Sequence, residues 1–288
     1  MESDKGVNAV SRRRVTQIFP FLLPLRRWQR RQLFYIKMRL DGNRYAKEIA
    51  VVDLPYEVFS TSSLMRNKNS GFDMKYQVNK VHNLKLAAKP LDKFIIKPNE
   101  TFSFWQLVRY ADRFQPYKDG LNLVDGKIVG SYGGGICQLS NMLFWMFLHT
   151  PLTLVERHGH AVESFPSTSD SLPFGTDATI NEGWLDLKVR NETDITFQIN
   201  ISFDGEFMYG HIRSDKEQTY KYKIFNQSVS YYKVGSQVFQ KASVDCMRTN
   251  IIKGQNEQVF LYNNTCEIGY ELPDDIEIVK HGGNKNET

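Results

Sequence analysis

Cys137 is the residue with the clearest chemical potential, because it follows the glycine run Gly133–Gly135 and opens a long apolar segment. Glycines allow positive φ and close backbone approach, and a thiol at the start of a helix is more readily deprotonated to the nucleophilic thiolate. We predict that Cys137 is a nucleophile. The backbone of Gly134 and Gly135 and the amide of Gln138 are then expected to bind substrate or an oxyanion. Alternatively, Cys137 is a small core residue and Gln138 bonds to nearby backbone.

Two histidines, His158 and His160, follow shortly after the apolar segment. In a strand, residues at positions i and i+2 face the same side, so both rings would be presented together. Either histidine can serve as general base to Cys137 while the other binds substrate, and we favour His160 as the base. Two alternatives stay open: a pair of surface histidines, or a metal site formed by Cys137, His158 and His160.

A cysteine–histidine pair needs a third group to hold the imidazole. Glu163, Asp177 or a backbone carbonyl could fill this role, although Asp177 lies in a sequence typical of a turn. Arg157 is predicted to clamp a substrate carboxylate with two hydrogen bonds. Its alternative is a plain ion pair with Glu156 or Glu163.

Composition and charge narrow the class of protein. A chain of 288 residues with 41% hydrophobic residues can build a substantial core. Its net charge of +5 is concentrated near the N-terminus, in residues 12–14 and 26–31, and forms no basic stripe over a folded face. We therefore expect no nucleic-acid partner.

The apolar run 18–25 is far shorter than the roughly 20 residues that span a bilayer, and two prolines interrupt it. It does not have the pattern of an export signal either. We therefore expect a protein that is cytoplasmic or peripheral to the inner membrane face. Residues 1–32 are predicted to be a weakly ordered basic arm, with peripheral contact of this arm with a membrane as the alternative.

The cysteine count is odd, which leaves at least one free thiol. Cys246 and Cys266 would pair only in an exported protein, and reduced thiols are favoured here. No Cys-x-x-Cys pair is present, so we predict no structural zinc and no cofactor.

The order of elements predicts an α+β fold. Helical spacing covers 75–88, and the segment 136–148 is apolar on all sides, so it should be a buried central helix after the glycine-rich loop. It is expected to pack on antiparallel sheet and to be followed by a β-rich C-terminal part. We expect short strands, or a helix and a strand, within 33–58 and a linker at 60–72. The predicted divisions are a basic arm 1–32, an N-terminal subdomain 33–74, a core domain 75–215 and a β-rich extension 216–288.

Four blocks in this order resemble one known family. They are Asn99–Phe104 (NETFSF), Gly133–Ser140 (GGGICQLS), Glu156–His160 (ERHGH) and Gly175–Ile180 (GTDATI). Together they are similar to the VanW family, and the likeness covers roughly residues 75–215.

The resemblance implies an accessory role in glycopeptide (vancomycin) resistance. Some extracellular relatives are assigned L,D-transpeptidase activity on peptidoglycan, with the cysteine of the glycine-rich block as nucleophile. This implies that Cys137 accepts an acyl group from a peptidoglycan stem peptide or wall precursor, with His158 or His160 as base. The alternative is a non-catalytic accessory module that binds a wall precursor or a partner protein through the same pocket.

Overall fold

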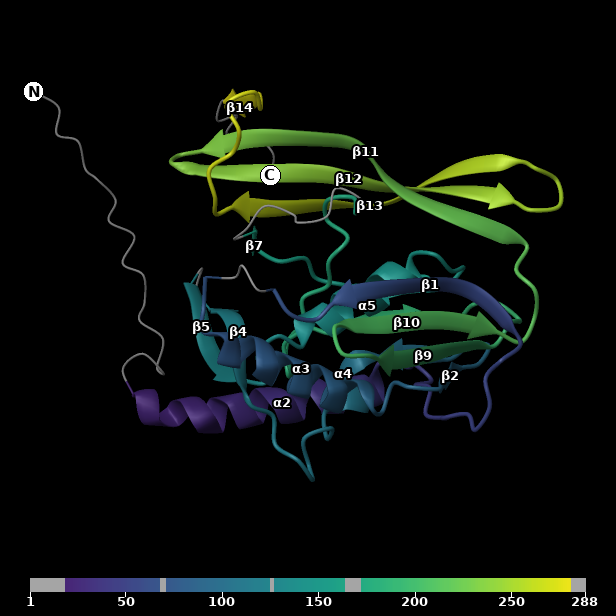
Figure 1. Cartoon of the computed structure of the whole chain (residues 1–288), viewed down its shortest axis with the longest axis horizontal. Coiled ribbons are helices and arrows are strands. Elements are labelled where there is room, and N and C mark those ends of the chain that lie inside the picture. Colours follow the sequence, from purple (N-terminus) through teal and green to yellow (C-terminus); the bar gives the residue numbers. More distant parts are fainter. Residues whose placement is uncertain (1–18, 68–70, 125–126, 164–171, 281–288) are drawn as a thin grey trace, which may run out of the picture.

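The computed structural model describes residues 19–67, 71–124, 127–163 and 172–280. The α+β fold class is confirmed: helices and short sheets form the lower body in Figure 1, and a long antiparallel sheet lies above them. The arginines at 12–14 lie outside the described residues.

The body contains a four-stranded antiparallel sheet. Its order is β1 (Tyr56–Leu64), β10 (Phe207–Ser214), β9 (Phe197–Phe203) and β2 (Phe94–Ile96). Burial alternates along β10, so one face of this strand points into the core. Gly210 on that face leaves no space for a Cβ, because such an atom would lie 2.4 Å from Met146 Sδ. The missing side chain allows the central helix to pack closely on the sheet.

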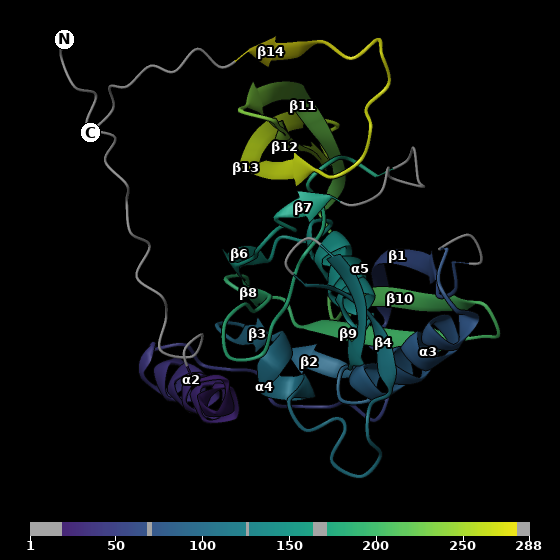
Figure 2. The ribbon, with the colours of Figure 1, turned by 90° about the vertical axis from the view of Figure 1, so that its left-hand side faces the viewer.

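The central helix α5 (Cys137–Phe147) is buried along most of its length, as predicted from its apolar sequence. It packs on β1 and β10 and also contacts α3 (Met74–Ala88). Asp73 caps α3 by accepting a hydrogen bond from the Lys75 N–H. Figure 2 shows α5 in the middle of the body, with β6, β8 and β3 on one side and β1 and β10 on the other.

Two small sheets complete the body. The first consists of β3 (Thr101–Ser103), β8 (Lys188–Arg190) and β6 (Thr153–Glu156), and the second of β4 (Asp119–Val124) and β5 (Lys127–Tyr132). Ser103 caps the short helix α4 (Phe104–Val108). Its hydroxyl also donates to the buried Asp186, at 2.5 Å, which ties β3 to the chain leading into β8.

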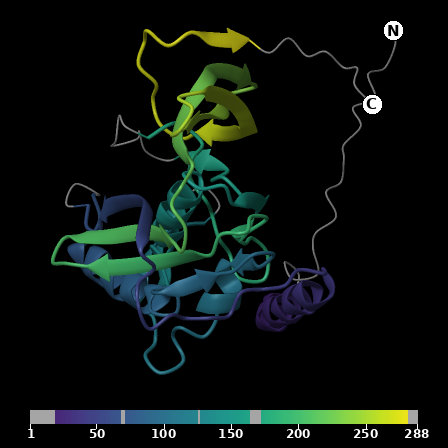
Figure 3. The same ribbon diagram turned by 90° about the vertical axis from the view of Figure 1, so that its right-hand side faces the viewer.

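The C-terminal sheet has the order β14 (Ile278–Lys280), β11 (Tyr220–Val234), β12 (Gln237–Asn250), β13 (Asn256–Ile268) and β7 (Val162–Glu163). Strand β7 comes from the predicted core domain and pairs with β13 in parallel. The predicted extension 216–288 is therefore joined to the core through a shared sheet, which Figure 3 shows above the body.

The N-terminal segment differs from the expectation of a loose arm followed by strands. After the 3₁₀ turn η1 (Pro20–Leu22), helix α2 runs over Leu23–Leu40, so the predicted boundary at 32/33 falls inside a helix. The apolar cluster 33–36, for which a strand is one expectation, belongs to this helix, and the predicted linker 60–72 includes the end of β1. Short apolar runs do not distinguish helix from strand by periodicity, whereas the Arg, Gln and Leu residues around this one favour helix.

No helix in the four described ranges is both long and apolar enough to cross a bilayer. The three cysteines are free thiols. Cys246 is opposite Val259 and Cys266 opposite Gln240, so the two buried cysteines of the C-terminal sheet stand at separate positions along it.

Candidate functional site

The glycine-rich loop presents Cys137 as the first residue of α5. Gly133 and Gly135 have positive φ values of 73° and 89°, a conformation that L side chains rarely adopt. Asn83 of α3 donates a hydrogen bond of 3.0 Å to the Gly134 carbonyl. This hydrogen bond fixes the loop on α3. The half-buried Cys137 thiol lies at the helix start, with its Sγ 3.9 Å from the Ile180 carbonyl oxygen.

His160 lies beside Cys137, whose hydrogen-bonding and charge interactions act on the imidazole. The other side of its ring is held by Asp177: His160 Nδ1 lies 2.5 Å from Asp177 Oδ2, which also accepts the His160 backbone N–H at 2.7 Å. Because Nδ1 is engaged by the carboxylate, Nε2 is the ring nitrogen left for the thiol. Thiol, imidazole and carboxylate thus lie together in this order, Cys137, His160 and Asp177.

Arg157 holds the second oxygen of that carboxylate. Its Nη2 donates to Asp177 Oδ1 at 2.8 Å and to the Gly175 carbonyl at 2.7 Å, while its Nε donates to the Asp177 carbonyl. The side chain is only 7% exposed and lies over the rings of Phe144 and Tyr262. The prediction that Arg157 clamps a substrate carboxylate is therefore corrected: its donors bind Asp177, Gly175 and Asn264.

Electrostatics in this cluster favour a protonated histidine. Burial opposes the charge on His160, but the hydrogen bonds with Asp177 and Cys137 and the charges of both groups outweigh it and raise the pKa of His160 to about 10. Burial also opposes the charge on Asp177 and by itself would raise the pKa of this carboxyl group. The hydrogen bond with His160 and the charge of Arg157 outweigh burial, so the pKa of Asp177 is lowered. At neutral pH an imidazolium supported by a carboxylate is thus available beside the thiol.

The segment that carries Asp177 is fastened to α5 and to the histidine segment. Ser140 donates to the Ala178 carbonyl at 2.6 Å, and Asn141 accepts the Ala178 N–H at 2.8 Å. The next residue, Thr179, donates its N–H to the His158 carbonyl at 2.7 Å. These hydrogen bonds hold the segments that carry Cys137, His160 and Asp177 together in one cluster.

Residues of the C-terminal sheet also contact this cluster. Tyr262 of β13 donates to the Gly175 carbonyl at 3.0 Å, and Asn264 accepts from Arg157 Nη1 at 2.8 Å. Gly159 and Gly175 both lie against Asn264, where an added Cβ would approach its side chain to 2.5 Å. Residues from beyond position 215 thus help to hold Arg157 and, through it, Asp177.

His158 is directed away from the cysteine cluster. Its Nε2 lies 3.1 Å from Glu156 Oε1, and the other oxygen of Glu156 accepts Lys188 Nζ at 2.8 Å. The expected strand geometry does not apply, because β6 ends at Glu156 and both histidines follow in irregular backbone. Within the described part of the chain no cluster of three metal-binding side chains occurs, so the alternative metal site is not assembled.

Gln138 also serves structure. Its amide nitrogen donates to Ser63 Oγ at 2.7 Å and to the Leu64 carbonyl at 2.8 Å, which ties the helix start to β1. The predicted oxyanion donor is therefore corrected to the alternative of a side chain bonded to a neighbouring segment. Of the two glycines predicted to bind an oxyanion, Gly134 donates its N–H to the Ser131 carbonyl at 3.0 Å, and the role of Gly135 stays a prediction.

Lys80 is a candidate site residue that the sequence analysis missed. It lies on α3, and its aliphatic stem packs on Gly135, where an added Cβ would be 2.3 Å from Lys80 Cγ. Burial lowers the pKa of Lys80 to about 8, and no described carboxylate pairs with it. One lysine among the polar residues of an amphipathic helix carries no distinguishing sequence signal, so only its tertiary position identifies it.

The comparisons with known proteins agree with the resemblance seen in the four sequence blocks. The family model described as VanW like protein matches residues 79–213. The vancomycin B-type resistance protein VanW of Enterococcus faecalis is 50% identical over 270 residues, which is 93% of this chain and 98% of that protein.

An uncharacterized protein of Bacillus subtilis, YoaR, is 39% identical over 111 residues, covering 38% of this chain and 35% of that protein. No solved structure matches this chain. Identity to the enterococcal protein extends beyond the family core into both flanks of the chain. This chain therefore belongs to the VanW family.

Proposed function

We propose that this protein is an accessory protein of vancomycin resistance that acts as a cysteine acyltransferase of the L,D-transpeptidase type on peptidoglycan stem peptides or their precursors. The observation that carries the proposal is the sequence of contacts from Cys137 through His160 and Asp177 to Arg157. A module that only binds a precursor would not need a buried arginine to hold the carboxylate that orients a histidine beside a thiol.

The resistance role is supported by the enterococcal relative, a vancomycin B-type resistance protein that matches this chain almost end to end. Vancomycin-resistance functions act on cell-wall building, so a stem peptide or its precursor is the substrate class that agrees with this relative. The same class offers an amide carbonyl for a thiolate to attack.

The proposed reaction has two steps. In the first, the Cys137 thiolate attacks the carbonyl carbon of the third stem residue, and the amide bond to the fourth residue breaks as His160 gives its proton to the leaving amine. Backbone N–H groups of the glycine loop and of the start of α5 are the candidate donors to the oxyanion. In the second, an acceptor amine attacks the thioester, His160 takes its proton, and the C–S bond breaks to restore the thiolate.

Lys80 is the candidate group for binding the terminal carboxylate of the donor peptide. It is a cation packed on the loop two residues before Cys137, and no described acidic side chain pairs with it. A carboxylate from the substrate would compensate a charge that burial otherwise disfavours.

The direct test is formation of an acyl-enzyme. The purified chain is incubated with a tetrapeptide muropeptide, and its intact mass and the released amino acid are measured. We expect a thioester adduct and release of the fourth residue with the native chain and with Cys246→Ala, a control that keeps the candidate site. Cys137→Ala should give neither. Equal product profiles for native protein and Cys137→Ala would overturn the catalytic proposal.

The role of Lys80 predicts a pH-dependent affinity. In a Cys137→Ala background, binding of a tetrapeptide with a free C-terminal carboxylate should weaken as pH rises through about 8, because Lys80 loses its proton there. Lys80→Met should weaken binding at pH 7 roughly tenfold or more, as for a lost charge-assisted hydrogen bond. Lys80→Arg should retain binding at pH ~9, since arginine stays protonated.

Calorimetry with the C-terminal amide of the same peptide provides the control. The amide carries no charge, so its affinity should change little with pH or with Lys80→Met. If the carboxylate and amide peptides respond alike, Lys80 does not recognise the carboxylate.

A further inference from the structure

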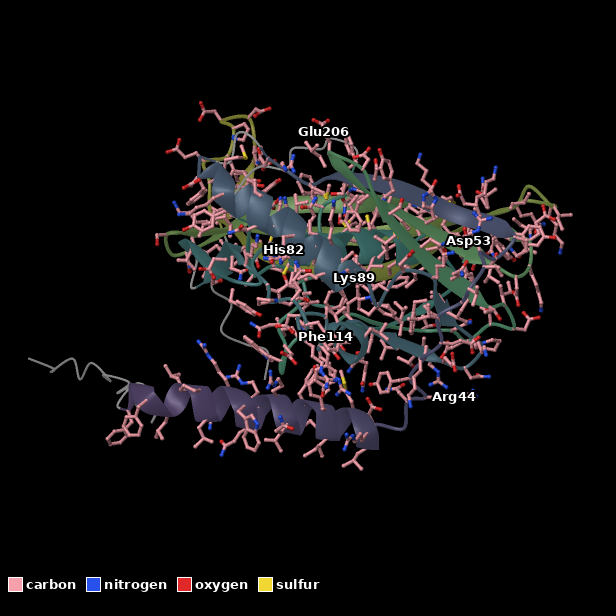
Figure 4. All side chains as sticks on the ribbon, turned by 60° about the horizontal axis from the view of Figure 1, so that its bottom comes forward. Arg44, Asp53, His82, Lys89, Phe114 and Glu206 are labelled. Atoms are coloured by element: carbon pink, nitrogen blue, oxygen red, sulfur yellow. The ribbon has the colours of Figure 1, made fainter. Side chains whose placement is uncertain are left out.

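Helix α2 has an apolar surface that no described part of the chain covers. The helix packs on the body through Tyr35 and Met38: Tyr35 donates to Glu182 at 2.8 Å, and Met38 is buried against Gln106. Figure 4 shows side chains projecting from α2 on the side away from the rest of the molecule. We call four large exposed apolar residues of this helix the outer stripe, which consists of Leu25, Leu33, Ile36 and Leu40.

The outer stripe follows helical spacing. On a wheel of about 100° per residue its members lie within about 80° of one another and opposite the side that bears Tyr35 and Met38. Their exposed fractions run from 48% for Ile36 to 79% for Leu40. A surface helix normally turns its apolar stripe to the core, so this helix has a second apolar side that faces outward.

Positive charge flanks the stripe. The helix carries six basic residues and no acidic one, namely Arg26, Arg27, Arg30, Arg31, Lys37 and Arg39. Of these, Arg31 pairs with Glu182 and Arg30 lies over the Trp184 ring, while the others have no ion-pair partner among the described residues. An apolar stripe bordered by unpaired cations is typical of a helix that lies in the interface of an anionic membrane.

A cleft of about 800 Å³ opens beside the same helix. The helix contributes Arg26, Arg30 and Lys37 to its lining, together with Leu33 at the edge of the outer stripe. The body contributes Trp184 and Lys188, and the acidic residues Asp41 and Glu156 also line the cleft. Four cations against two carboxylates give the cleft a net positive charge, which attracts anionic headgroups. This arrangement favours lipid headgroups over a second copy of the chain, because two α2 helices placed together would bring like charges into contact.

We propose that α2 docks the protein on an anionic lipid bilayer, with the outer stripe inserted among the acyl chains near the surface and the flanking cations among the headgroups. The helix lies parallel to the surface and does not cross the bilayer. Docking would hold the candidate site of Cys137 at the membrane, where lipid-linked wall precursors are found. The inference goes beyond the proposed chemistry, and its test does not require activity.

Flotation of the full chain with vesicles tests the docking. Native protein should float with vesicles of phosphatidylglycerol and phosphatidylcholine, should float much less with phosphatidylcholine alone, and should be released by high salt. The double variant Ile36→Gln, Leu40→Gln should reduce binding on the order of tenfold or more. The matched control is Ile251→Gln, Ile252→Gln, which alters residues 48% and 84% exposed at the far β-hairpin and should bind like native protein.

Charge is tested in the same way. The triple variant Arg26→Gln, Arg30→Gln, Lys37→Gln should lose about fivefold in binding for each charge removed. The matched triple Lys233→Gln, Lys241→Gln, Lys253→Gln removes as many exposed charges from the C-terminal sheet and should have little effect.

Two outcomes would overturn the proposal. One is equal flotation of the native chain and both α2 variants. The other is a native dimer in sedimentation analysis that Ile36→Gln, Leu40→Gln turns into a monomer without a change in vesicle binding, which would assign the outer stripe to a second copy.

Discussion

Asp177→Asn is expected to slow acyl transfer by on the order of 10⁴-fold while leaving substrate affinity nearly unchanged. The carboxylate accepts from His160 Nδ1 and selects the ring nitrogen that faces Cys137. An asparagine amide can turn its NH₂ toward Nδ1 and so favour the wrong tautomer. Single-turnover acylation, followed by intact mass, measures the rate directly.

An NMR titration of the His160 ring gives a second measurement of the same variant that needs no activity. Asp177 makes the largest contribution that raises the pKa of His160 to about 10, so Asp177→Asn should move the titration to lower pH. The control is Glu163→Gln, which changes a nearby carboxylate that contacts Cys266 and should keep the acylation rate within about twofold. A native rate in Asp177→Asn would show that Asp177 does not orient the base.

Arg157→Met is expected to lower the free energy of unfolding by about 3 kcal/mol, the low end of the cost of breaking a buried ion pair, because Asp177 is 27% exposed. Methionine retains much of the apolar contact with Phe144 and Tyr262 but removes every hydrogen bond to Asp177, Gly175 and Asn264. Two backbone carbonyl groups and a carboxylate would then lose this donor. Urea unfolding at neutral pH measures the change.

The comparison for this prediction is Arg248→Met. Arg248 donates to Glu257 at 2.8 Å, a distance equal to that between Arg157 and Asp177, but both side chains are exposed. Removing it should cost no more than about 1 kcal/mol. If the two arginine variants lose similar stability, the buried network is not the anchor that the contacts indicate.

The sequence alone identified the parts of this protein that depend on local pattern. The glycine run before an apolar segment predicted both the buried helix α5 and a cysteine at its start, and alternating residues predicted the β-rich C-terminal part. The four sequence blocks led to the VanW family, which the enterococcal relative confirms. Each of these features depends on residues that are close together in the sequence, so it can be predicted without knowing any long-range contact.

The partners of each side chain were decided by the tertiary structure. From sequence, Arg157 and Gln138 were expected to face substrate, yet their donors are used by Asp177 and by β1. Lys80 was overlooked, although it lies on the glycine loop. Hydrogen-bonding side chains have no periodicity that reveals their target, because the target is brought near by the fold.

For the two histidines and for helix α2, too, the sequence supplied the residue types and the tertiary structure supplied their contacts. The sequence places two histidines shortly after Cys137. That His160 is the one beside Cys137 depends on its contact with Asp177 and on the contacts of the Asp177 segment with α5. Likewise, the basic and apolar residues of α2 were evident in the sequence, whereas the side left uncovered was set by the packing of Tyr35 and Met38 on the body. Residue types state which chemistry is available, and packing determines which groups meet and which face solvent.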